Sequence, residues 1–376
     1  MHLVDTTMFF AARGGGVQRY LSAKRDWLRR HTSVRHTILA PAEPHAEAPD
    51  GVVTIRSRAL IRPYGFPFPL RLQRWRRQLV RLAPDLIEVG DPFGPAWSAL
   101  KAGQDLGTPV IGFYHSDLVR LVRTRLGCGG AWAAARYVRQ LYREFDLVMA
   151  PSRYVAERLK GMGIDRVVRQ PLGVDVEKFH PGRRDPLLRR QLGIAEDARL
   201  LVFAGRFAHE KNLPVLLSAF RKLGSRYHLL LVGGGMEVPH QDNLTVLPYQ
   251  TSESELARIL ASCDALAHAG QQETFGLVVL EAMACGLPVV GAAEGGVAEL
   301  VGERHGVLVP AATGDAFAQG IEALYERDLA ALGAMARHSV EANYSWDRVM
   351  HSLLSVYRER LLAFWSSAMR EAYACR

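Results

Sequence analysis

The chain lacks several features that would place it in a special structural class. Its 376 residues include four cysteines, widely spaced and without a Cys-x-x-Cys pair, so neither a zinc site nor a disulfide framework is predicted. No run of 18 apolar residues is present, which excludes an ordinary membrane-spanning helix. The first ten residues have no basic start and too short an apolar run for a signal peptide. These absences predict a cytoplasmic protein with reduced thiols.

Acidic residues are scarce in one half of the chain only. Residues 1–180 contain 28 Lys and Arg against 16 Asp and Glu, a balance of +12, whereas the remainder has 19 against 22, a balance of −3. The net charge of +9 therefore belongs to the N-terminal half. Such an excess suits an anionic partner: a nucleic acid, an anionic membrane surface or an anionic acceptor molecule.

Short apolar segments alternate with amphipathic ones along the whole chain, which is the pattern of parallel α/β domains. The length allows two domains with full cores. Residues 171–184 are rich in chain breakers and predict a linker between two sets of strand–helix units. In the first set, a helix is expected at Gly130–Phe145 after a basic segment that begins near Asp117.

The most informative segment is Glu273–Val290. It contains a second carboxylate, Glu281, eight residues after the first, and then a helix end and an apolar strand. A helix that starts near Gly276 offers free backbone amides that can hold an anion. Eight residues at helical rise separate the two Glu backbones by roughly 12 Å. Carboxylates that flank one glycosidic bond stand roughly 5–10 Å apart, so this pair better suits one long ligand with phosphates at its middle, such as a nucleotide-sugar.

This segment resembles the E-x7-E signature of retaining GT-B glycosyltransferases, in particular the large family 4, and the resemblance covers nearly the whole chain. It implies an α/β fold in which two Rossmann-like domains face each other across a cleft. The implied parts are an acceptor-binding domain (1–170), the linker (171–184), a nucleotide-sugar-binding domain (185–345) and a C-terminal helix (346–376) that crosses back to the first domain. The resemblance also implies retention of the anomeric configuration.

The same resemblance assigns roles within the signature. It implies that Glu273 accepts hydrogen bonds from the sugar hydroxyls and that Glu281 binds the ribose. Phe275, Gly276 and Leu277 would present backbone amides to sugar and phosphate. Without the resemblance, Glu273 is a partner of a helix N-cap and Glu281 a solvated helix residue.

A basic loop follows a strand in the second half, with Arg206 and Lys211 in the sequence GRFAHEK. It resembles the family pattern whose Arg and Lys hold the donor diphosphate. Fixed cations stabilise the negative charge that a diphosphate gains as the glycosidic bond breaks. The alternative is two surface bases near a helix start.

In the first half, three glycines follow Arg13 and open a helix, so that their amides can face a ligand. The resemblance places Gly15 and Gly16 beside the donor; an ordinary strand–helix turn is the alternative. His115 follows an apolar strand and resembles the active-site His of the family, which contacts the donor sugar. The alternative is a histidine satisfied by backbone at a strand end.

A helix expected at Leu70–Leu82 carries a basic face, and its Arg71, Arg74, Trp75 and Arg77 are predicted to contact an acceptor or membrane. Basic amphipathic helices with aromatic residues suit an anionic bilayer interface. The simpler interpretation is an apolar stripe that packs into the core beneath a solvated basic face.

The function predicted from these residues is hexose transfer from a nucleotide-sugar to a lipid, lipid-linked or glycan acceptor at the cytoplasmic membrane face. A UDP-hexose is slightly favoured over GDP-mannose. No D-x-D motif is found, and the resemblance implies no metal and no cofactor. The alternatives are a GT-B sugar-nucleotide epimerase and a non-catalytic protein that binds glycans or nucleic acid, although no nucleic-acid-binding motif is found.

Overall fold

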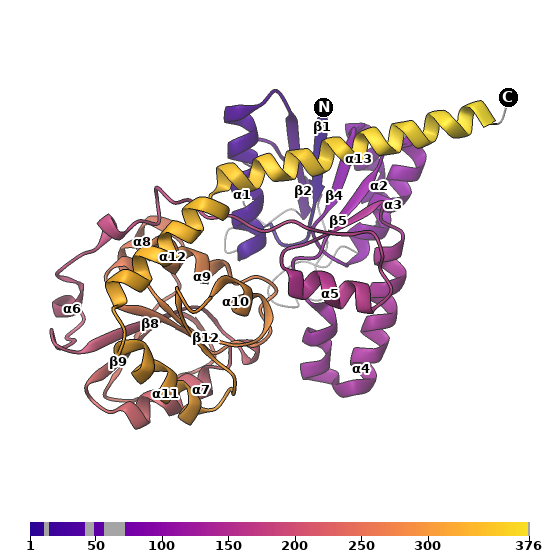
Figure 1. Cartoon of the computed structure of the whole chain (residues 1–376). Helices are drawn as coiled ribbons and strands as arrows, with labels where there is room; N and C mark the ends of the chain where they lie inside the picture. Colours follow the sequence, from indigo (N-terminus) through magenta and orange to yellow (C-terminus); the bar gives the residue numbers. More distant parts are fainter. Residues whose placement is uncertain (11–14, 42–48, 56–71, 375–376) are drawn as a thin grey trace. The chain divides into compact units, whose positions relative to one another are not determined.

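The computed structural model describes residues 1–10, 15–41, 49–55 and 72–374, with side chains through residue 366. The chain divides into two compact units (Figure 1). The N-terminal unit consists of Met1–Pro171 together with Val349–Arg376, and the C-terminal unit consists of Leu172–Arg348. In the described residues no helix is long and apolar enough to cross a membrane.

The described part of the N-terminal unit contains a parallel seven-stranded sheet in the order β3-β2-β1-β4-β5-β6-β7. Its strands are β1 (His2–Thr6), β2 (Arg35–Pro41), β3 (Val52–Ile55), β4 (Leu86–Val89), β5 (Val110–Phe113), β6 (Leu147–Ala150) and β7 (Val167–Arg169). Its helices are α1 (Gly16–His31), α2 (Leu72–Leu82), α3 (Gly94–Leu106), α4 (Leu118–Arg143), α5 (Arg153–Gly161) and the long α13 (Trp346–Ala374), which begins in the C-terminal unit.

The C-terminal unit contains a parallel six-stranded sheet in the order β10-β9-β8-β11-β12-β13. Its strands are β8 (Arg199–Phe207), β9 (Tyr227–Gly235), β10 (Leu244–Leu247), β11 (Ala265–His268), β12 (Val289–Ala292) and β13 (Gly306–Val309). Its helices are η2 (Pro181–Arg183), α6 (Leu188–Gln191), η3 (His209–Lys211), α7 (Leu213–Leu223), α8 (Glu253–Ala261), α9 (Leu277–Ala284), α10 (Gly295–Leu300), α11 (Gly314–Tyr325) and α12 (Leu329–Asn343).

Continuous apolar sequence explains why the central strands form here. Leu200–Phe203 of β8 are fully buried, as expected for a parallel strand with helices on both of its faces. The strand order reverses beside β8, which pairs with β9 on one side and with β11 on the other. In such sheets the ligand binds beyond the carboxyl ends of the strands at this reversal. The topology therefore directs attention to the residues that follow β8 and β11.

The main departure from the predicted elements lies in α4, which starts at Leu118 rather than near Gly130. Gly127 has φ 65° and ψ −158°, so the helix is interrupted there and resumes. The glycine-rich stretch 127–130 was interpreted as the boundary of a single helix, but it is a turn between two helical halves. The first half begins at Asp117, whose side chain accepts a hydrogen bond from the amide of Arg120.

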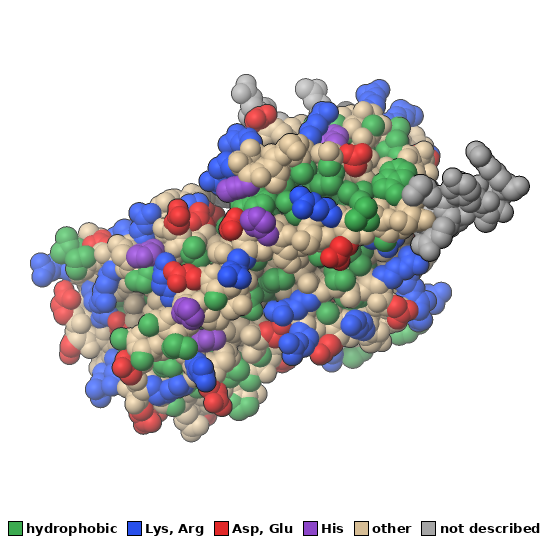
Figure 2. Space-filling view, turned by 45° about the horizontal axis from the view of Figure 1, so that its top comes forward, with side chains coloured by type: hydrophobic (Ala, Val, Ile, Leu, Met, Phe, Trp, Pro, Cys, Tyr) green, Lys and Arg blue, Asp and Glu red, His purple; other side chains and the backbone are tan. Residues whose placement is uncertain are grey.

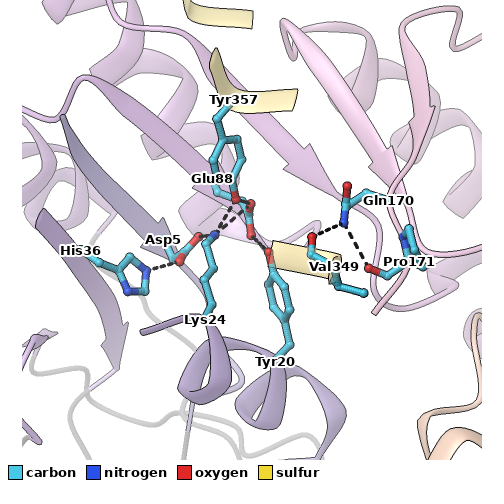
Figure 3. A network of polar contacts seen from close by, with 9 residues as sticks. All are labelled: Asp5, Tyr20, Lys24, His36, Glu88, Gln170, Pro171, Val349 and Tyr357. Atoms are coloured by element: carbon cyan, nitrogen blue, oxygen red, sulfur yellow. Dashed lines mark hydrogen bonds and ion pairs between the residues drawn. The ribbon is translucent and has the colours of Figure 1, made fainter. Parts of the chain in front are cut away.

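A buried ionic network fastens α13 to the sheet of the N-terminal unit (Figure 3). Lys24 of α1 is fully buried, and its ammonium group donates to Asp5 at 2.8 Å and to the Tyr357 hydroxyl at 2.6 Å. It also lies 3.1 Å from Glu88. Asp5 and Glu88 are paired in register on the adjacent strands β1 and β4. A residue of the last helix thus completes a cluster at the centre of the first sheet.

The two carboxylates of this network differ in proton affinity. Burial raises the pKa of Asp5, but Lys24 and His36 oppose burial and hold that pKa well below its usual range. Burial raises the pKa of Glu88 to about 7, because Lys24 offsets burial only in part and Asp5 adds a negative charge nearby. The hydroxyls of Tyr20 and Tyr357 both donate to Glu88. One lysine, one histidine and two phenols therefore satisfy two buried carboxylates.

Candidate nucleotide-sugar site

The end of β8 and the segment that follows it carry the basic residues that were predicted to bind phosphate, which places Arg206 in the strand rather than in the expected loop. The guanidinium of Arg206 is 60% exposed and donates to Glu210 at 3.0 Å. Lys211 ends the short helix η3, and Asn212, with φ 54°, turns the chain into α7. Arg206 therefore lies at the carboxyl end of a central strand and Lys211 just beyond it, where the fold places ligands.

Three consecutive glycines, Gly233–Gly235, form the end of strand β9. These glycines pair with the end of β8, and a Cβ on Gly233 would lie 1.9 Å from the carbonyl oxygen of Gly205. A Cβ on Gly235 would lie 2.4 Å from the carbonyl oxygen of Phe207. The absence of side chains lets the two strands stay closely paired through Arg206 to the end of β8.

Lys211 and Glu273 form a direct ion pair although they are 62 residues apart in the sequence. Their side chains are 18% and 16% exposed. His268, the last residue of β11, completes the cluster with its Nε2 atom 3.2 Å from Oε1 of Glu273. The amide of Gly270 donates to Nδ1 of the same ring at 3.3 Å, so the imidazole proton lies on Nε2, the ring nitrogen near the carboxylate.

The cluster keeps Glu273 ionised. Burial by itself would raise the pKa of this carboxyl group, but Lys211 and the hydrogen bond from His268 lower that pKa well below its usual range. A carboxylate that is charged at every physiological pH accepts hydrogen bonds only. It is therefore suited to hold hydroxyl groups, and the adjacent ammonium is suited to attract phosphate.

The residues after Glu273 form the start of α9. Phe275 is buried, and Gly276 takes φ 97° and ψ 56° at the N-cap position immediately before Leu277. No side chain caps this helix start, so the first amides of α9 are available to an anion. Glu281 lies one turn further along α9 and is 2% exposed, which rules out the alternative that it is a solvated helix residue.

The start of α10 packs against the backbone of Glu273 and Phe275. The amide of Gly296 donates to the carbonyl oxygen of Glu273 at 2.8 Å. A Cβ on Gly296 would lie 2.6 Å from the Cα of Phe275, and one on Gly295 would lie 2.9 Å from the carbonyl oxygen of Glu273. These two glycines allow backbone to pack on backbone and so fix the position of Glu273.

We expect Gly296→Ala to weaken nucleotide binding, because the new methyl group must displace the backbone at Phe275. Overpacking of this kind costs about 1–3 kcal/mol. Nucleotide affinity measured by calorimetry, together with the melting temperature, checks the expectation. Gly302→Ala is the matched control, since the nearest atom to its Cβ lies 3.8 Å away. Equal nucleotide affinity in the two variants would contradict the role given to the close contact.

In the N-terminal unit, His115 follows β5 and is buried. Its ring stacks on Phe113 at 4.0 Å and lies 5.1 Å from the ring of Tyr20. Burial and, to a smaller extent, the charge of Lys24 together lower the pKa of His115 to about 3. The imidazole is therefore neutral at physiological pH and can serve as a hydrogen-bonding group rather than as a cation.

Gly15 and Gly16, also in the N-terminal unit, are exposed at the start of α1, where Gly15 is the N-cap. Arg13 and Gly14 lie outside the described residues. No side chain caps α1 either, so the amides of its first turn are open to a ligand.

The predicted acceptor or membrane surface on α2 needs one correction. Trp75 is fully buried, and its indole nitrogen donates to Thr6 at the end of β1. It belongs to the core of the unit, so its inclusion in a membrane-facing surface was wrong. Arg74 and Arg77 are exposed on the opposite side of the helix, whereas Arg71 lies outside the described residues.

His268 is the site residue that the sequence analysis missed. It ends an otherwise apolar strand, in the segment Ala265–His268, and is buried. A histidine at the carboxyl end of a strand beside the reversal of strand order is a usable signal, but that order is known only from the structure. Within the described parts of the chain, no three His, Cys, Asp or Glu residues gather into a group that could hold a metal ion.

Two parallel sheets in separate units, with a carboxylate–lysine pair beside a helix start in the second, are the parts of a GT-B glycosyltransferase. Comparison with known families agrees. The model for glycosyl transferases group 1 matches residues 185–344, and the model for glycosyltransferase family 4 matches residues 14–178. The chain belongs to family 4 of the GT-B glycosyltransferases, and it is a glycosyltransferase that uses a nucleotide-sugar.

Individual relatives and solved structures are similar to this chain over nearly its whole length. It is 32% identical over 368 residues to the GDP-mannose-dependent alpha-mannosyltransferase of Mycobacterium tuberculosis, covering 93% of this chain and 94% of that protein. The structure of sucrose-phosphate synthase from Thermosynechococcus elongatus matches with a TM-score of 0.81 and 20% identity, over 96% of this chain and 99% of that one. Anabaena HepE in complex with UDP-glucose matches with a TM-score of 0.76 and 18% identity, over 96% and 100%. The two structures show the shared fold.

Proposed function

We propose that the protein transfers mannose from GDP-mannose, with retention of the anomeric configuration, to a lipid or lipid-linked acceptor at an anionic membrane surface. The observation that carries the proposal is the cluster of Lys211, Glu273 and His268 beside the start of α9. It offers a cation for phosphate, a permanently ionised acceptor for sugar hydroxyls and free helix amides within one short segment of the fold.

Each residue of the cluster has a defined task in this proposal. The diphosphate gains negative charge as its bond to the sugar breaks, and Arg206, Lys211 and the first amides of α9 stabilise that charge. Glu273 accepts hydrogen bonds from the sugar hydroxyls and keeps the sugar oriented. Glu281 holds the ribose hydroxyls of the nucleotide.

The acceptor hydroxyl attacks from the side of the leaving group, and a phosphate oxygen of the donor takes its proton. Neutral His115 contributes a hydrogen bond to the sugar rather than acting as a base, and Gly15 and Gly16 face the donor. The reaction proposed here uses no metal and no cofactor.

The choice of GDP-mannose rests on sequence similarity. A curated relative that matches over 94% of its length is named a GDP-mannose-dependent alpha-mannosyltransferase, and an alpha product is what retention yields from an alpha-linked donor. The sequence analysis slightly favoured a UDP-hexose. The UDP-glucose complex of a structural neighbour at 18% identity keeps that donor class as the second candidate.

A donor screen tests the proposal. We expect the purified protein to bind GDP at least about tenfold more tightly than UDP, a difference of about 1.4 kcal/mol, and to release GDP slowly from GDP-mannose in the absence of acceptor. Turnover of UDP-glucose alone would replace the donor, and failure to bind any nucleotide-sugar would refute the transferase mechanism. Conversion of the donor into an isomeric sugar without a second substrate would identify an epimerase.

A further inference from the structure

The positive charge of the N-terminal half does not by itself mark a docking face. Figure 2 shows basic, acidic and hydrophobic side chains mixed on the face in view. A more specific feature is the turn between the two halves of α4, which we call the α4 tip and define as residues 123–132. Figure 1 shows the two halves of α4 side by side at one end of the N-terminal unit.

The α4 tip is built as a tight turn. Gly127, with its positive φ, reverses the chain direction. A Cβ on Gly130 would lie 2.5 Å from the Cβ of Leu126 and 3.1 Å from Cγ1 of Val122. The two halves of the helix are therefore packed together where the turn begins and ends, and the tip is a projecting helical hairpin rather than a loose loop.

Large apolar side chains lie exposed at this tip. Leu126 is 71% exposed and Trp132 is 70% exposed, two of the three highest values among the exposed large hydrophobic residues of the described chain. Neither side chain contributes to the core of the unit. A leucine and a tryptophan on a projecting turn form a small apolar surface that its own fold does not cover.

The charge of α4 has one sign only. The helix contains six arginines and no acidic residue; the arginines are Arg120, Arg123, Arg125, Arg136, Arg139 and Arg143. Those at positions 123, 125 and 136 are exposed next to the apolar pair. Guanidinium groups that surround an apolar projection match the anionic headgroups that surround the apolar interior of a bilayer.

The exposed apolar residues of α13 provide a useful contrast. Leu362 is 70% exposed and Trp365 is 49% exposed, but the preceding turn contains Glu359 between two arginines. This patch has a comparable apolar area with mixed charge. Charge complementarity therefore distinguishes the α4 tip from the other exposed tryptophan of the same unit.

We propose that the α4 tip is the surface by which this protein binds an anionic lipid bilayer, with Trp132 and Leu126 inserted at the headgroup level and the arginines on phosphate groups. This inference deepens the proposed function, because it rests on a membrane-bound acceptor and says which part of the protein reaches the membrane. It moves the contact from α2, whose tryptophan is buried, to α4. Tryptophan suits this depth because its ring is apolar and its N–H group can reach the headgroups.

Vesicle sedimentation tests the inference with the full-length protein. We expect binding to vesicles that contain phosphatidylglycerol, little binding to pure phosphatidylcholine, and weaker binding as salt rises. Trp132→Ala should lower the partition coefficient about tenfold, because the variant lacks the aromatic side chain that inserts into the bilayer. Arg123→Gln and Arg136→Gln should each lower it about fivefold, since each removes one charge at the surface. Trp365→Ala is the matched control and should leave binding unchanged.

Donor hydrolysis without vesicles, measured on the same samples, separates the two proposals. Trp132→Ala should retain full hydrolysis and an unchanged melting temperature, because the residue is exposed and belongs to the N-terminal unit, whereas the donor cluster belongs to the C-terminal unit. Binding that is equal in the two tryptophan variants, or lost in Trp365→Ala instead, would overturn the α4 inference and leave the transferase standing. If added DNA displaced the protein from the vesicles, the α4 tip would be assigned to nucleic acid instead. If the protein self-associated and Trp132→Ala abolished this, the tip would be assigned to a second copy of the chain. Either result would overturn the α4 inference.

Discussion

Replacing Lys211 with alanine is expected to lower donor hydrolysis by about two to three orders of magnitude, the usual effect of losing one fixed group that stabilises a developing negative charge. The loss should appear in kcat as much as in nucleotide affinity, because the charge on the diphosphate grows as the sugar bond breaks. Steady-state hydrolysis of the nucleotide-sugar and calorimetric binding of the nucleoside diphosphate separate these two contributions.

The same variant should acquire a new dependence on pH. In the wild-type protein Lys211 and His268 hold the pKa of Glu273 well below its usual range against the effect of burial. Without the ammonium group, burial raises that pKa, so the residual activity should fall at mildly acidic pH where the wild type is unaffected. Lys222→Ala is the control, because it removes a lysine of the same unit that pairs with the exposed Asp315. A control as inactive as Lys211→Ala, or an unaltered pH profile, would contradict the assigned role.

The second large effect is expected at Lys24. Lys24→Met leaves Asp5 and Glu88 buried without their shared cation, and breaking a buried ion pair in this way costs about 3–5 kcal/mol. For a unit of this size the melting temperature should fall by about 10 °C. Urea unfolding followed by circular dichroism measures the change.

Tyr357→Phe provides the graded comparison. It removes a hydroxyl that accepts from Lys24 and donates to Glu88, and it should cost about 1–3 kcal/mol. Its specific signature is faster proteolysis of α13, because Tyr357 is the contact of that helix with the network. Arg76→Ala, which breaks an exposed pair with Asp105, should leave stability unchanged. If Lys24→Met were no more destabilising than Arg76→Ala, the network would not hold the unit together.

The sequence predicted the alternation of strands and helices well, because apolar runs in a parallel α/β fold are long and separated by turn residues. It also singled out Glu273, Lys211 and Arg206 as candidates, since each lies at the end of a strand or soon after one in a recognisable pattern. It did not predict that Lys211 and Glu273 touch, because that contact depends on the spatial order of β8 and β11. Nor did it place Trp75, since a helical wheel shows which residues share a face but not what covers that face.

Neither the α4 turn nor the buried ionic network could be predicted from the sequence. A run of glycines marks a break but does not say whether the helix resumes antiparallel to itself. Lys24 and Tyr357 are separated by 333 residues, and no local sequence pattern predicts that a lysine is buried. Contacts of this kind are properties of the tertiary arrangement and require the structure.

The composition of the N-terminal unit has a consequence for the order in which the protein folds as it is synthesised. The C-terminal unit is one continuous stretch, Leu172–Arg348, whereas the N-terminal unit needs Val349–Arg376 as well. Since Tyr357 closes the network around Lys24, the half of the protein that is made first is the half that is finished last. Until α13 leaves the ribosome, the first sheet must hold an incomplete cluster of buried charges, while the second unit is already free to fold.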